Sequence, residues 1–491
     1  MADANVSVRE DMKDFWVEHS EHATVDDMML DSNSEAIDKL ERPEVLQLLG
    51  SVEEKRVLEL GAGIGRFTAD LARTAKTVHA VDFIQRFTDA NKVANAEHKN
   101  VSVECADATK AEYAENAFDV VFSNWLLMYL TDEEIKTLAS NILLWLGEKG
   151  TFFFRESCFQ QSGDRKRKKN PTQYRKPQDY FALFDGAEAT MADGRIACFK
   201  LEFCKSLDSY VELKHNQNQL CWKLTKVVSD VKTEAAFRNF LDTSQYSRNG
   251  ILRYERIFGE GFVSTGGLDT TQEFISQLDL KPGQRVLDIG CGIGGGDFLM
   301  ADKYGCKVHG MDLSVNMISI ALERASGRKN ALVTFEIADC TTRDYGEESF
   351  DVVYSRDTIL HVQDKPALFK LFLKFLKPGG KLMISDYCRS EAEPTEAFKA
   401  YIKQRGYDLH SPSQYGKMIE AAGFTDVVAK DATDMFEASL RKELALVEGI
   451  KDEYIKEFSQ KDYNDIVDGW KAKLGRLDQQ RWGFFTAAKP L

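Results

Sequence analysis

The amino-acid sequence predicts an α/β protein in which one doubly wound, mostly parallel sheet is built twice. Short apolar runs rich in Val, Ile and Phe alternate with helical patterns, as is typical of parallel strands joined by helices on both faces. A glycine-rich turn directly follows one such run in each half of the chain. At 491 residues, the chain is long enough to form two large cores.

Four segments of the first half return in the second half in the same order. Residues 57–65 match 286–294, 78–82 match 308–312, 117–123 match 349–355, and 147–150 match 377–380. Solenoid units of about 20 to 50 residues cannot fold alone, whereas repeats of this length are complete domains. We therefore predict two domains, 1–235 and 236–491. The boundary falls between the last strands of the first copy, within 199–227, and a lead-in helix near 233–241.

Helix signals occupy the connections between the predicted strands. Periodicity and end signals predict helices at 44–49, 67–74, 318–325 and 367–376, the last ending before Pro378 and two glycines. The strands at 56–60 and 285–289 run directly into the glycine-rich turns.

The glycines of these turns predict a ligand site in each half. They are Gly61, Gly63 and Gly65 in the first copy and Gly290, Gly292 and Gly294 in the second. Glycine permits positive φ and lets a ligand approach the backbone without meeting a Cβ, at the crevice outside the carboxyl ends of the strands. A nucleotide-like ligand fits such a turn. For a single copy, a tight loop that binds nothing is the alternative.

Acidic residues near the turns narrow the choice of ligand. Asp82 and Asp312 end the next predicted strand, where a carboxylate can accept both ribose hydroxyls. Glycine count alone also fits a dinucleotide, whose pyrophosphate faces a helix N-terminus. Glu59 and Asp288, interpreted as standing at the strand start, would repel pyrophosphate and attract a cationic amino acid. This favours S-adenosylmethionine, which carries a sulfonium and no phosphate.

A third acidic position recurs in both copies. Asp107 precedes Ala108, and Asp339 precedes Cys340, at a place where the adenine amino group can be held. Two copies of the whole constellation argue against coincidence.

Composition limits the partners. The chain has 64 Lys and Arg against 78 Asp and Glu, and a net charge of −14 does not suit a general nucleic-acid binder. Nine thinly spread cysteines indicate reduced thiols. The N-terminal residues contain no apolar signal-peptide core, and no apolar stretch is long enough to span a bilayer. We expect a cytoplasmic protein without membrane insertion; no oligomeric state is predicted.

Other chemistries find little support in the sequence. No clustered Cys/His spacing indicates a metal, and SN2 methyl transfer from a sulfonium needs none. The Asn/Asp-Pro-Pro-aromatic motif of amino-methylating DNA enzymes is missing from both halves. The corresponding places read Ser-Asn-Trp at 123–125 and Ser-Arg-Asp at 355–357.

Longer motifs distinguish the second half. They are SQYS at 244–247, YERIFG at 254–259, VSTGG at 263–267, YSRDTILH at 354–361, SDYC at 385–388 and YIKQRGY at 401–407. With these motifs the chain resembles the phosphoethanolamine N-methyltransferases, in particular plant-type enzymes with two fused domains, over essentially its whole length. The resemblance implies two tandem Rossmann-like class I methyltransferase domains that use S-adenosylmethionine and no metal.

The resemblance also implies the reaction. Phosphoethanolamine would be methylated to phosphocholine through mono- and dimethyl intermediates, feeding choline and phosphatidylcholine synthesis. The first methylation falls to the N-terminal domain and the later two to the C-terminal domain. Tyr246 and His361 match a catalytic dyad over the substrate amine. An ammonium must lose a proton before it attacks a sulfonium methyl, and a histidine-backed phenol can accept that proton. A structural hydrogen bond is the alternative for this pair.

Further site residues follow from the same resemblance. Phosphate binding is assigned to Tyr387, Arg405, Tyr407 and Lys473, and the remaining pocket to Gln245, Tyr254, Ser264, Asp357 and Tyr401. Arginine forms a bidentate fork with phosphate, lysine supplies a point charge, and phenols supply neutral donors. Core packing is the alternative for the tyrosines. Aromatic faces can hold a methylammonium through cation–π attraction. The predicted cofactor residues are Gly61, Gly63, Gly65, Arg66, Asp82, Asp107, Ala108, Asn124, Val263, Ser264, Gly290, Gly292, Asp312, Asp339, Cys340 and Arg356.

The first half departs from this pattern. Trp125 and Tyr129 stand where the second half has its aspartate and histidine, so no dyad is recognisable, and His19 is an open candidate for the base. Its predicted substrate residues are Ser157, Tyr174 and Arg175, close to a basic loop at 164–169. That loop either attracts phosphate or is a solvated charge run.

Two alternatives stay open. The protein could methylate another small acceptor, such as a sterol or quinone precursor. One half could also bind cofactor only as a regulatory module.

Overall fold

The computed structural model describes residues 12, 14–18, 24–165, 170–229, 242, 246–328 and 332–491. It divides into two compact units, Met1–Ala236 with Ser326–Ala331, and Phe237–Ala325 with Leu332–Leu491. Several predicted features lie outside the described residues: His19, Gln245, most of the basic loop and the lead-in helix near 233–241.

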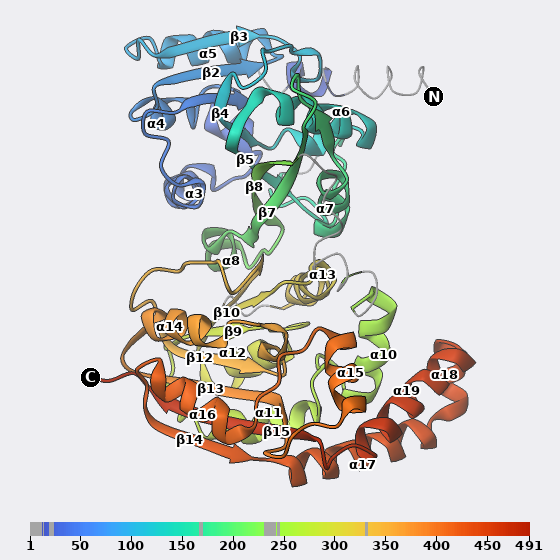
Figure 1. The fold of residues 1–491 in the computed structure, drawn as a ribbon. Coiled ribbons are helices and arrows are strands. Elements are labelled where there is room, and N and C mark those ends of the chain that lie inside the picture. Colours follow the sequence, from blue (N-terminus) through green and yellow to red (C-terminus); the bar gives the residue numbers. More distant parts are fainter. Residues whose placement is uncertain are drawn as a thin grey trace. The chain divides into compact units, whose positions relative to one another are not determined.

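The N-terminal unit is built on a mostly parallel sheet (Figure 1). Its strands are β1 Arg56–Leu60, β2 Thr77–Asp82, β3 Val101–Cys105, β4 Phe118–Asn124, β5 Leu146–Ser157, β6 Glu188–Thr190, β7 Ile196–Ser206 and β8 Gln219–Ser229. They follow the order β7-β8-β5-β4-β1-β2-β3, and β6 pairs with β7. Strands β1 to β5 are mutually parallel where they pair, whereas β8 is antiparallel to β5 and β7.

The helices of this unit follow their start signals. They are α2 Val25–Met29, α3 Ser34–Leu49, α4 Thr68–Ala72, α5 Gln85–Ala94, α6 Asp132–Trp145, α7 Pro177–Asp185 and α8 Asp208–Lys214, with short 3-10 turns η1 Ala108–Lys110 and η2 Leu127–Tyr129. Helix α6 begins with a capping box in which Thr131 and Glu134 satisfy each other's backbone N–H groups. The predicted helix at 44–49 is the last part of α3.

The C-terminal unit repeats the same sheet. Its strands are β9 Arg285–Ile289, β10 Lys307–Asp312, β11 Val333–Ala338, β12 Phe350–Arg356, β13 Leu376–Arg389, β14 Thr425–Asp431 and β15 Gln480–Ala488. The order is β14-β15-β13-β12-β9-β10-β11, with β15 antiparallel to both of its neighbours. The order reverses beside β1 in one unit and beside β9 in the other, so each glycine turn opens at the switch point where ligands bind.

A longer helical connection between its last two strands distinguishes the C-terminal unit. Its helices are α10 Arg248–Phe258, α11 Gly267–Ser276, α12 Gly295–Tyr304, α13 Val315–Ala325, α14 Lys365–Phe375, α15 Glu396–Arg405, α16 Pro412–Ala421, α17 Thr433–Gly449, α18 Lys451–Glu457 and α19 Gln460–Leu474, with the turn η4 Ile359–His361. Helices α17 to α19 connect the last two strands, whereas the equivalent connection of the N-terminal unit holds α8. Of these three helices, α19 contributes Trp470 and Lys473 to the lining of a cavity in this unit.

The central strands explain the continuous apolar runs in the sequence. Val120 and Val121 in β4, and Val352 and Val353 in β12, are almost completely buried because helices cover both faces of each sheet. The predicted fold class, two doubly wound α/β domains, is therefore confirmed.

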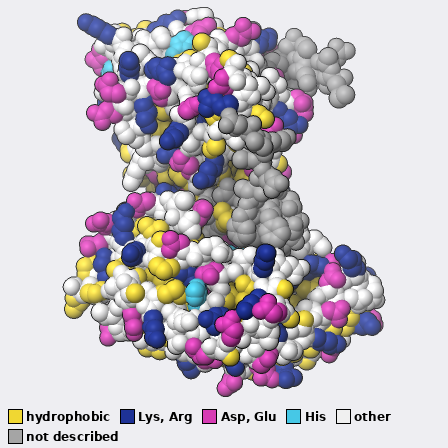
Figure 2. All heavy atoms as spheres, viewed as in Figure 1, with side chains coloured by type: hydrophobic (Ala, Val, Ile, Leu, Met, Phe, Trp, Pro, Cys, Tyr) yellow, Lys and Arg dark blue, Asp and Glu magenta, His cyan; other side chains and the backbone are white. Residues whose placement is uncertain are grey.

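The distribution of charges, the thiols and the helix lengths in the structure can be compared with what the composition predicts. Figure 2 shows acidic and basic side chains interspersed over the visible face, with no large area of one sign. All nine cysteines are free thiols. Among the helices that the structure describes, none combines the length and the apolar character needed to cross a bilayer.

Candidate active sites

The glycine turn of the C-terminal unit approaches its neighbours so closely that side chains cannot be added. Gly290 and Gly292 have φ values of 79° and 57°. A Cβ on Gly290 would lie 2.0 Å from Thr358 Oγ1, and one on Gly292 would lie 2.8 Å from Val263 Cγ2. Glycine is required here by both backbone conformation and space.

Asp312 at the end of β10 holds this turn in place. Its Oδ2 accepts the Gly292 N–H at 3.1 Å, and its Oδ1 accepts the Ser314 N–H at 2.8 Å. Burial raises the pKa of Asp312 to about 7. The N-terminal unit repeats the arrangement at Asp82, which accepts the N–H groups of Gly63 and Ile84, each at 2.9 Å. Burial raises the pKa of Asp82 to about 6.

The two acidic residues interpreted as standing at the strand start lie elsewhere. Glu59 and Asp288 are the fourth of the five residues of β1 and β9, so this part of the prediction was wrong. Parallel pairing begins at Arg56 and Arg285, earlier in each strand. Both carboxyl groups are nearly inaccessible, and burial raises the pKa of Glu59 to about 8 and that of Asp288 to about 7.

The predicted cofactor residues of the C-terminal unit line one cavity of about 690 Å³. They are Val263, Ser264, Gly290, Gly292, Asp312, Asp339, Cys340 and Arg356. Glycines at a switch point, a strand-end carboxylate and a polar loop fit a nucleoside. Arg356 itself donates to Thr271 Oγ1 at 2.5 Å and to the Thr265 carbonyl at 2.9 Å, so it fixes the start of α11.

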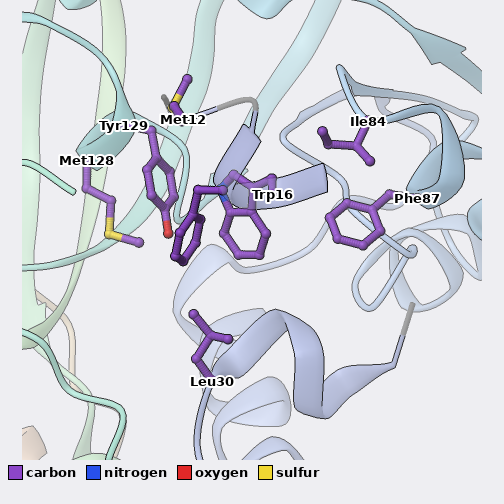
Figure 3. Packing of buried hydrophobic residues seen from close by; sticks show 8 residues of the cluster. Met12, Trp16, Leu30, Ile84, Phe87, Met128 and Tyr129 are labelled. Carbon is purple, nitrogen blue, oxygen red and sulfur yellow. The ribbon is translucent and has the colours of Figure 1, made fainter. Parts of the chain in front are cut away.

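The cavity of the N-terminal unit is far smaller, about 90 Å³. Its lining includes Gly61, Arg66, Asp82, Asp107, Ala108, Asn124, Ser157 and Tyr174, whereas Gly63 and Gly65 of the same turn do not line it. Met12 and Trp16 also line this cavity. The Trp16 ring makes edge contacts with Phe87 at 6.0 Å and with Tyr129 at 5.6 Å between ring centroids (Figure 3). Aromatic packing by the N-terminal segment therefore fills much of this site.

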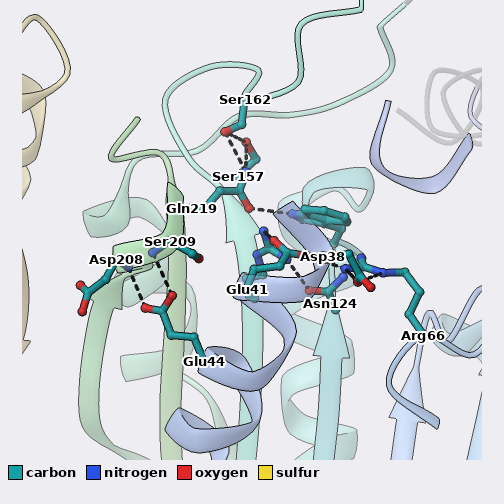
Figure 4. Close-up of polar contacts among 12 residues, drawn as sticks. Asp38, Glu41, Glu44, Arg66, Asn124, Ser157, Ser162, Asp208, Ser209 and Gln219 are labelled. Atoms are coloured by element: carbon teal, nitrogen blue, oxygen red, sulfur yellow. Dashed lines mark hydrogen bonds and ion pairs between the residues drawn. The ribbon is translucent and has the colours of Figure 1, made fainter. Parts of the chain in front are cut away.

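A buried charge network lies beside the N-terminal cavity (Figure 4). Arg66 donates to Asp38 at 2.6 Å and to Glu41 at 2.5 Å, and Arg155 donates to the other oxygen of Glu41 at 2.5 Å. Arg155 also donates to Asn124 Oδ1 at 3.2 Å. Arg155 is not among the residues predicted from the sequence, although a charged residue next to a run of phenylalanines was a usable signal.

Gln219 on β8 organises a second set of polar groups in this unit. Its Oε1 accepts the Trp125 indole N–H at 2.8 Å, and its Nε2 donates to Ser157 Oγ at 3.0 Å and to Ser162 Oγ at 2.7 Å (Figure 4). Arg175 does not reach the cavity. Its guanidinium donates to the carbonyls of residues 127 and 130 and to Asp132, so it holds the η2 turn.

Tyr246 and His361 are brought together in the C-terminal cavity. The phenol oxygen lies 3.5 Å from His361 Nε2, and the rings meet edge to face. Burial lowers the pKa of His361 to about 4, with smaller contributions from the positive charges of Lys365 and Arg405. Burial raises the pKa of Tyr246 well above its ordinary value. At neutral pH the pair is therefore a neutral imidazole beside a protonated phenol.

The predicted phosphate residues gather in the same cavity. Arg405, Tyr387, Tyr401, Tyr407 and Lys473 all line it. Within the described part of the chain, no carboxylate lies within ion-pair distance of Arg405 or Lys473. Their cationic heads instead face aromatic rings, with Arg405 over Tyr401 at 5.8 Å and Lys473 over Tyr387 at 5.8 Å. This end of the cavity is therefore positively charged and can bind an anion.

Three residues that were not predicted from the sequence form or support the same end of the cavity. Arg476 donates to the Tyr401 hydroxyl at 3.0 Å, and its guanidinium lies 4.1 Å from that ring. Trp470 packs against Tyr254 at 5.9 Å and carries Lys473 Nζ over its face at 4.6 Å. Glu443 accepts the Trp470 indole N–H at 2.8 Å. Glu443 lies on α17, Trp470 lies on α19 and Arg476 follows the end of α19, and no short motif identifies this part of the chain.

Asp357 has a supporting position at the cavity. It adopts a left-handed φ of 52°, as Trp125 does at 56° in the equivalent turn of the other unit. Its Oδ1 accepts the Trp482 indole N–H at 2.8 Å. Burial raises the pKa of Asp357.

Comparison with known proteins identifies the family. Models of a methyltransferase domain match residues 57–150 and 280–423, so each contains one glycine turn. The phosphoethanolamine N-methyltransferase of Triticum aestivum is 56% identical over 98% of this chain and 95% of its own length. Phosphoethanolamine N-methyltransferase 1 of Arabidopsis thaliana is 54% identical over the full length of both chains. This chain belongs to the phosphoethanolamine N-methyltransferase family.

A solved structure of the family covers almost the whole methyltransferase. Phosphoethanolamine N-methyltransferase 2 of Haemonchus contortus, in complex with phosphomonomethylethanolamine and S-adenosylhomocysteine, is 29% identical with a TM-score of 0.76. The match spans 93% of this chain and 100% of that one. In the described residues of our methyltransferase, no group of three or more His, Cys, Asp or Glu side chains is placed to hold a metal ion.

Proposed function

We propose that this methyltransferase converts phosphoethanolamine to phosphocholine in three methyl transfers from S-adenosylmethionine. The observation that carries the proposal is the pair Arg405 and Lys473, which lack carboxylate partners among the described residues and line the cavity that contains Tyr246 and His361. A dianionic phosphate would neutralise both cations while its amine reaches the dyad. An apolar acceptor would leave both cations without an ion-pair partner at contact distance in a partly closed site.

The cofactor fits the glycine side of the same cavity. The Gly290–Gly292 turn, Asp312 and Asp339 would hold the nucleoside, and Val263 and Ser264 would cover the turn. When bound, S-adenosylmethionine supplies an electrophilic methyl group on a sulfonium.

Tyr246 and His361 would remove the proton from the substrate ammonium. His361 is neutral at pH 7 because its pKa is about 4, so it can accept a proton. The Tyr246 hydroxyl is 3.5 Å from His361 Nε2 and would pass that proton from the ammonium to the imidazole. Removal of the proton leaves a lone pair on the amine nitrogen. Each later methylation starts from a protonated amine and needs the same step.

Aromatic side chains suit the methylated intermediates. Tyr246, Tyr254, Trp470 and Tyr407 line the C-terminal cavity. Every methyl group added to the amine removes one N–H donor, whereas cation–π attraction to a ring persists. The cavity can therefore hold mono- and dimethylated substrates without a second pocket.

We further propose that the N-terminal unit, 1–235, performs the first methylation and that 236–491 performs the later two. The C-terminal cavity contains the Tyr246–His361 pair and the aromatic side chains that suit repeated methylation of an already methylated amine. In the N-terminal unit, Ser157 and Tyr174 remain the candidates for contacts to substrate. Nine free thiols suit a reducing compartment, and we place the enzyme in the cytoplasm with a small phosphobase as its partner.

The decisive test is a product assay. Purified protein is incubated with S-adenosylmethionine and either phosphoethanolamine or ethanolamine, and methylated products are separated by mass. We expect mono-, di- and trimethylated phosphobases from the first substrate only. Efficient methylation of ethanolamine would refute the phosphate assignment.

A variant of the full chain tests the division of labour. In His361→Ala, we expect the monomethyl product to accumulate because the N-terminal unit stays active. If no monomethyl product forms in this variant while cofactor still binds, the N-terminal unit is a regulatory module.

A further inference from the structure

Glu443 on α17 connects two walls of the C-terminal cavity through one carboxylate. Its Oε1 accepts the backbone N–H of Gly266 at 2.6 Å, and its Oε2 accepts the indole N–H of Trp470 at 2.8 Å. The side chain is only 5% exposed. Both acceptor oxygens are therefore used by groups from different elements, away from bulk water.

The first wall is the loop that precedes α11. Gly266 caps α11 with a φ of 77°, and Val263, Ser264 and Thr265 immediately before it line the cavity. Val263 lies against the turn at Gly292, since a Cβ on that glycine would meet its side chain at 2.8 Å. The position of the Gly266 backbone thus determines the position of the loop over the proposed cofactor site.

The second wall is the cavity-facing side of α19. Trp470 and Lys473 are three residues apart and lie on the same helical face. The Lys473 ammonium lies 4.6 Å from the Trp470 ring and reaches toward Tyr387 at 5.8 Å. Glu443 therefore holds the Trp470 ring in place, and this ring in turn supports the Lys473 ammonium that we propose binds phosphate.

We propose that Glu443 is a positioning residue that couples phosphobase binding to cofactor binding in the C-terminal unit. This inference rests on the proposed function of that unit. Any rotation of Trp470 that accompanies phosphate binding by Lys473 moves Glu443, and Glu443 transmits the shift to Gly266 and the loop at 263–265. The coupling requires that one side chain accept two hydrogen bonds at once.

Glu443→Gln tests that requirement with little change of shape. The amide oxygen of glutamine can accept one of the two N–H groups, but its NH₂ faces the other as a second donor. The enzyme must then lose either the Gly266 contact or the Trp470 contact. We expect the KM for phosphodimethylethanolamine to rise about tenfold, while kcat stays within about threefold of the wild-type value.

A second readout separates coupling from structural damage. In the wild-type enzyme, saturating S-adenosylhomocysteine should tighten phosphobase binding, and Glu443→Gln should abolish this effect. Trp470→Phe keeps an aromatic surface but removes the indole N–H, so it should weaken phosphobase binding by a similar factor. In the Trp470→Phe background, Glu443→Gln should add little, because the shared contact has already been lost.

The matched control is Glu437→Gln on the same helix. Glu437 pairs with Arg441 at the surface and touches neither wall, so kinetic constants should stay at wild-type values. Unchanged cofactor dependence of phosphobase binding in both Glu443→Gln and Trp470→Phe would overturn the inference. His361→Ala shows whether the proposed function itself is wrong. If that variant also turns over phosphodimethylethanolamine normally, the reaction does not take place in this cavity. If Glu443→Gln does not fold, Trp470→Phe alone decides.

Discussion

Arg155 on β5 lies in register with Asn124 on β4 and donates to its side-chain oxygen at 3.2 Å. The equivalent pair of the C-terminal unit has the arginine on the other strand, with Arg356 on β12 opposite Ser385 on β13. In both units the guanidinium reaches an early helix, through Glu41 on α3 or Thr271 on α11. The duplicated fold thus keeps a buried cation at the ligand end of the sheet while its position in the sequence has changed.

Breaking this network should destabilise the N-terminal unit. Arg155→Met leaves Glu41 with one buried partner, and loss of one member of a buried ionic pair costs about 3 to 5 kcal/mol. Denaturant unfolding, monitored for the N-terminal unit, measures the change. Arg56→Gln is the control, because the Arg56–Asp119 pair is more than one-third exposed and should contribute at most about 1 kcal/mol. Equal effects of the two variants would contradict the importance of the network.

His361→Ala should lower turnover of phosphodimethylethanolamine by about 10²-fold or more, the range of general-base contributions. Cofactor affinity should change little, because His361 faces Tyr246 and Tyr407. Steady-state kinetics and calorimetry with S-adenosylhomocysteine check the two expectations. His98→Ala, at a site in the other unit, is the control. Wild-type turnover by the His361 variant would remove the dyad from the mechanism.

Arg405→Gln and Lys473→Met should raise the KM for phosphobases by about 10- to 100-fold each. Charge-assisted hydrogen bonds contribute about 1.5 to 3 kcal/mol, and neither cation has a carboxylate partner in the described chain to compensate for the change. Initial rates with phosphobase as the varied substrate provide the measurement. The cofactor KM serves as the internal control. If neither variant changes the phosphobase KM, the phosphate lies elsewhere.

Lys365→Met should move the acidic limb of the kcat profile to higher pH. Lys365 is buried, donates to Asp408 at 3.0 Å, and helps Arg405 and burial to hold the pKa of His361 near 4. Without this cation the imidazole is protonated at a higher pH, so the fraction of neutral base falls sooner on acidification. Rates at saturating substrate between about pH 3.5 and 7 check the shift, because the acidic limb of the wild-type enzyme lies near the His361 pKa of about 4. Lys370→Met, exposed on the same helix, should leave the profile unchanged.

The sequence predicted much of the fold, and most residues that it selected in the second half line one cavity. Strand-to-turn transitions at Gly61 and Gly290 are local signals, and their repetition established two domains of one type. The longer motifs around Tyr246, His361 and Arg405 were also recognisable, because each is a continuous run of residues in the sequence. Arg175 shows the limit of this approach: beside a basic loop it suggested phosphate binding, but the fold turns its guanidinium onto backbone carbonyls.

By itself, the sequence determined that the chain contains two doubly wound units, each with a glycine turn, because hydrophobic periodicity and glycine placement act over a few neighbouring residues. Only the tertiary structure decided which distant groups share a site: Arg155 with Glu41, Gln219 with Trp125, and Glu443 with Gly266 and Trp470. These contacts join helices and strands far apart along the chain. Their geometry depends on packing, which no local pattern of residues specifies.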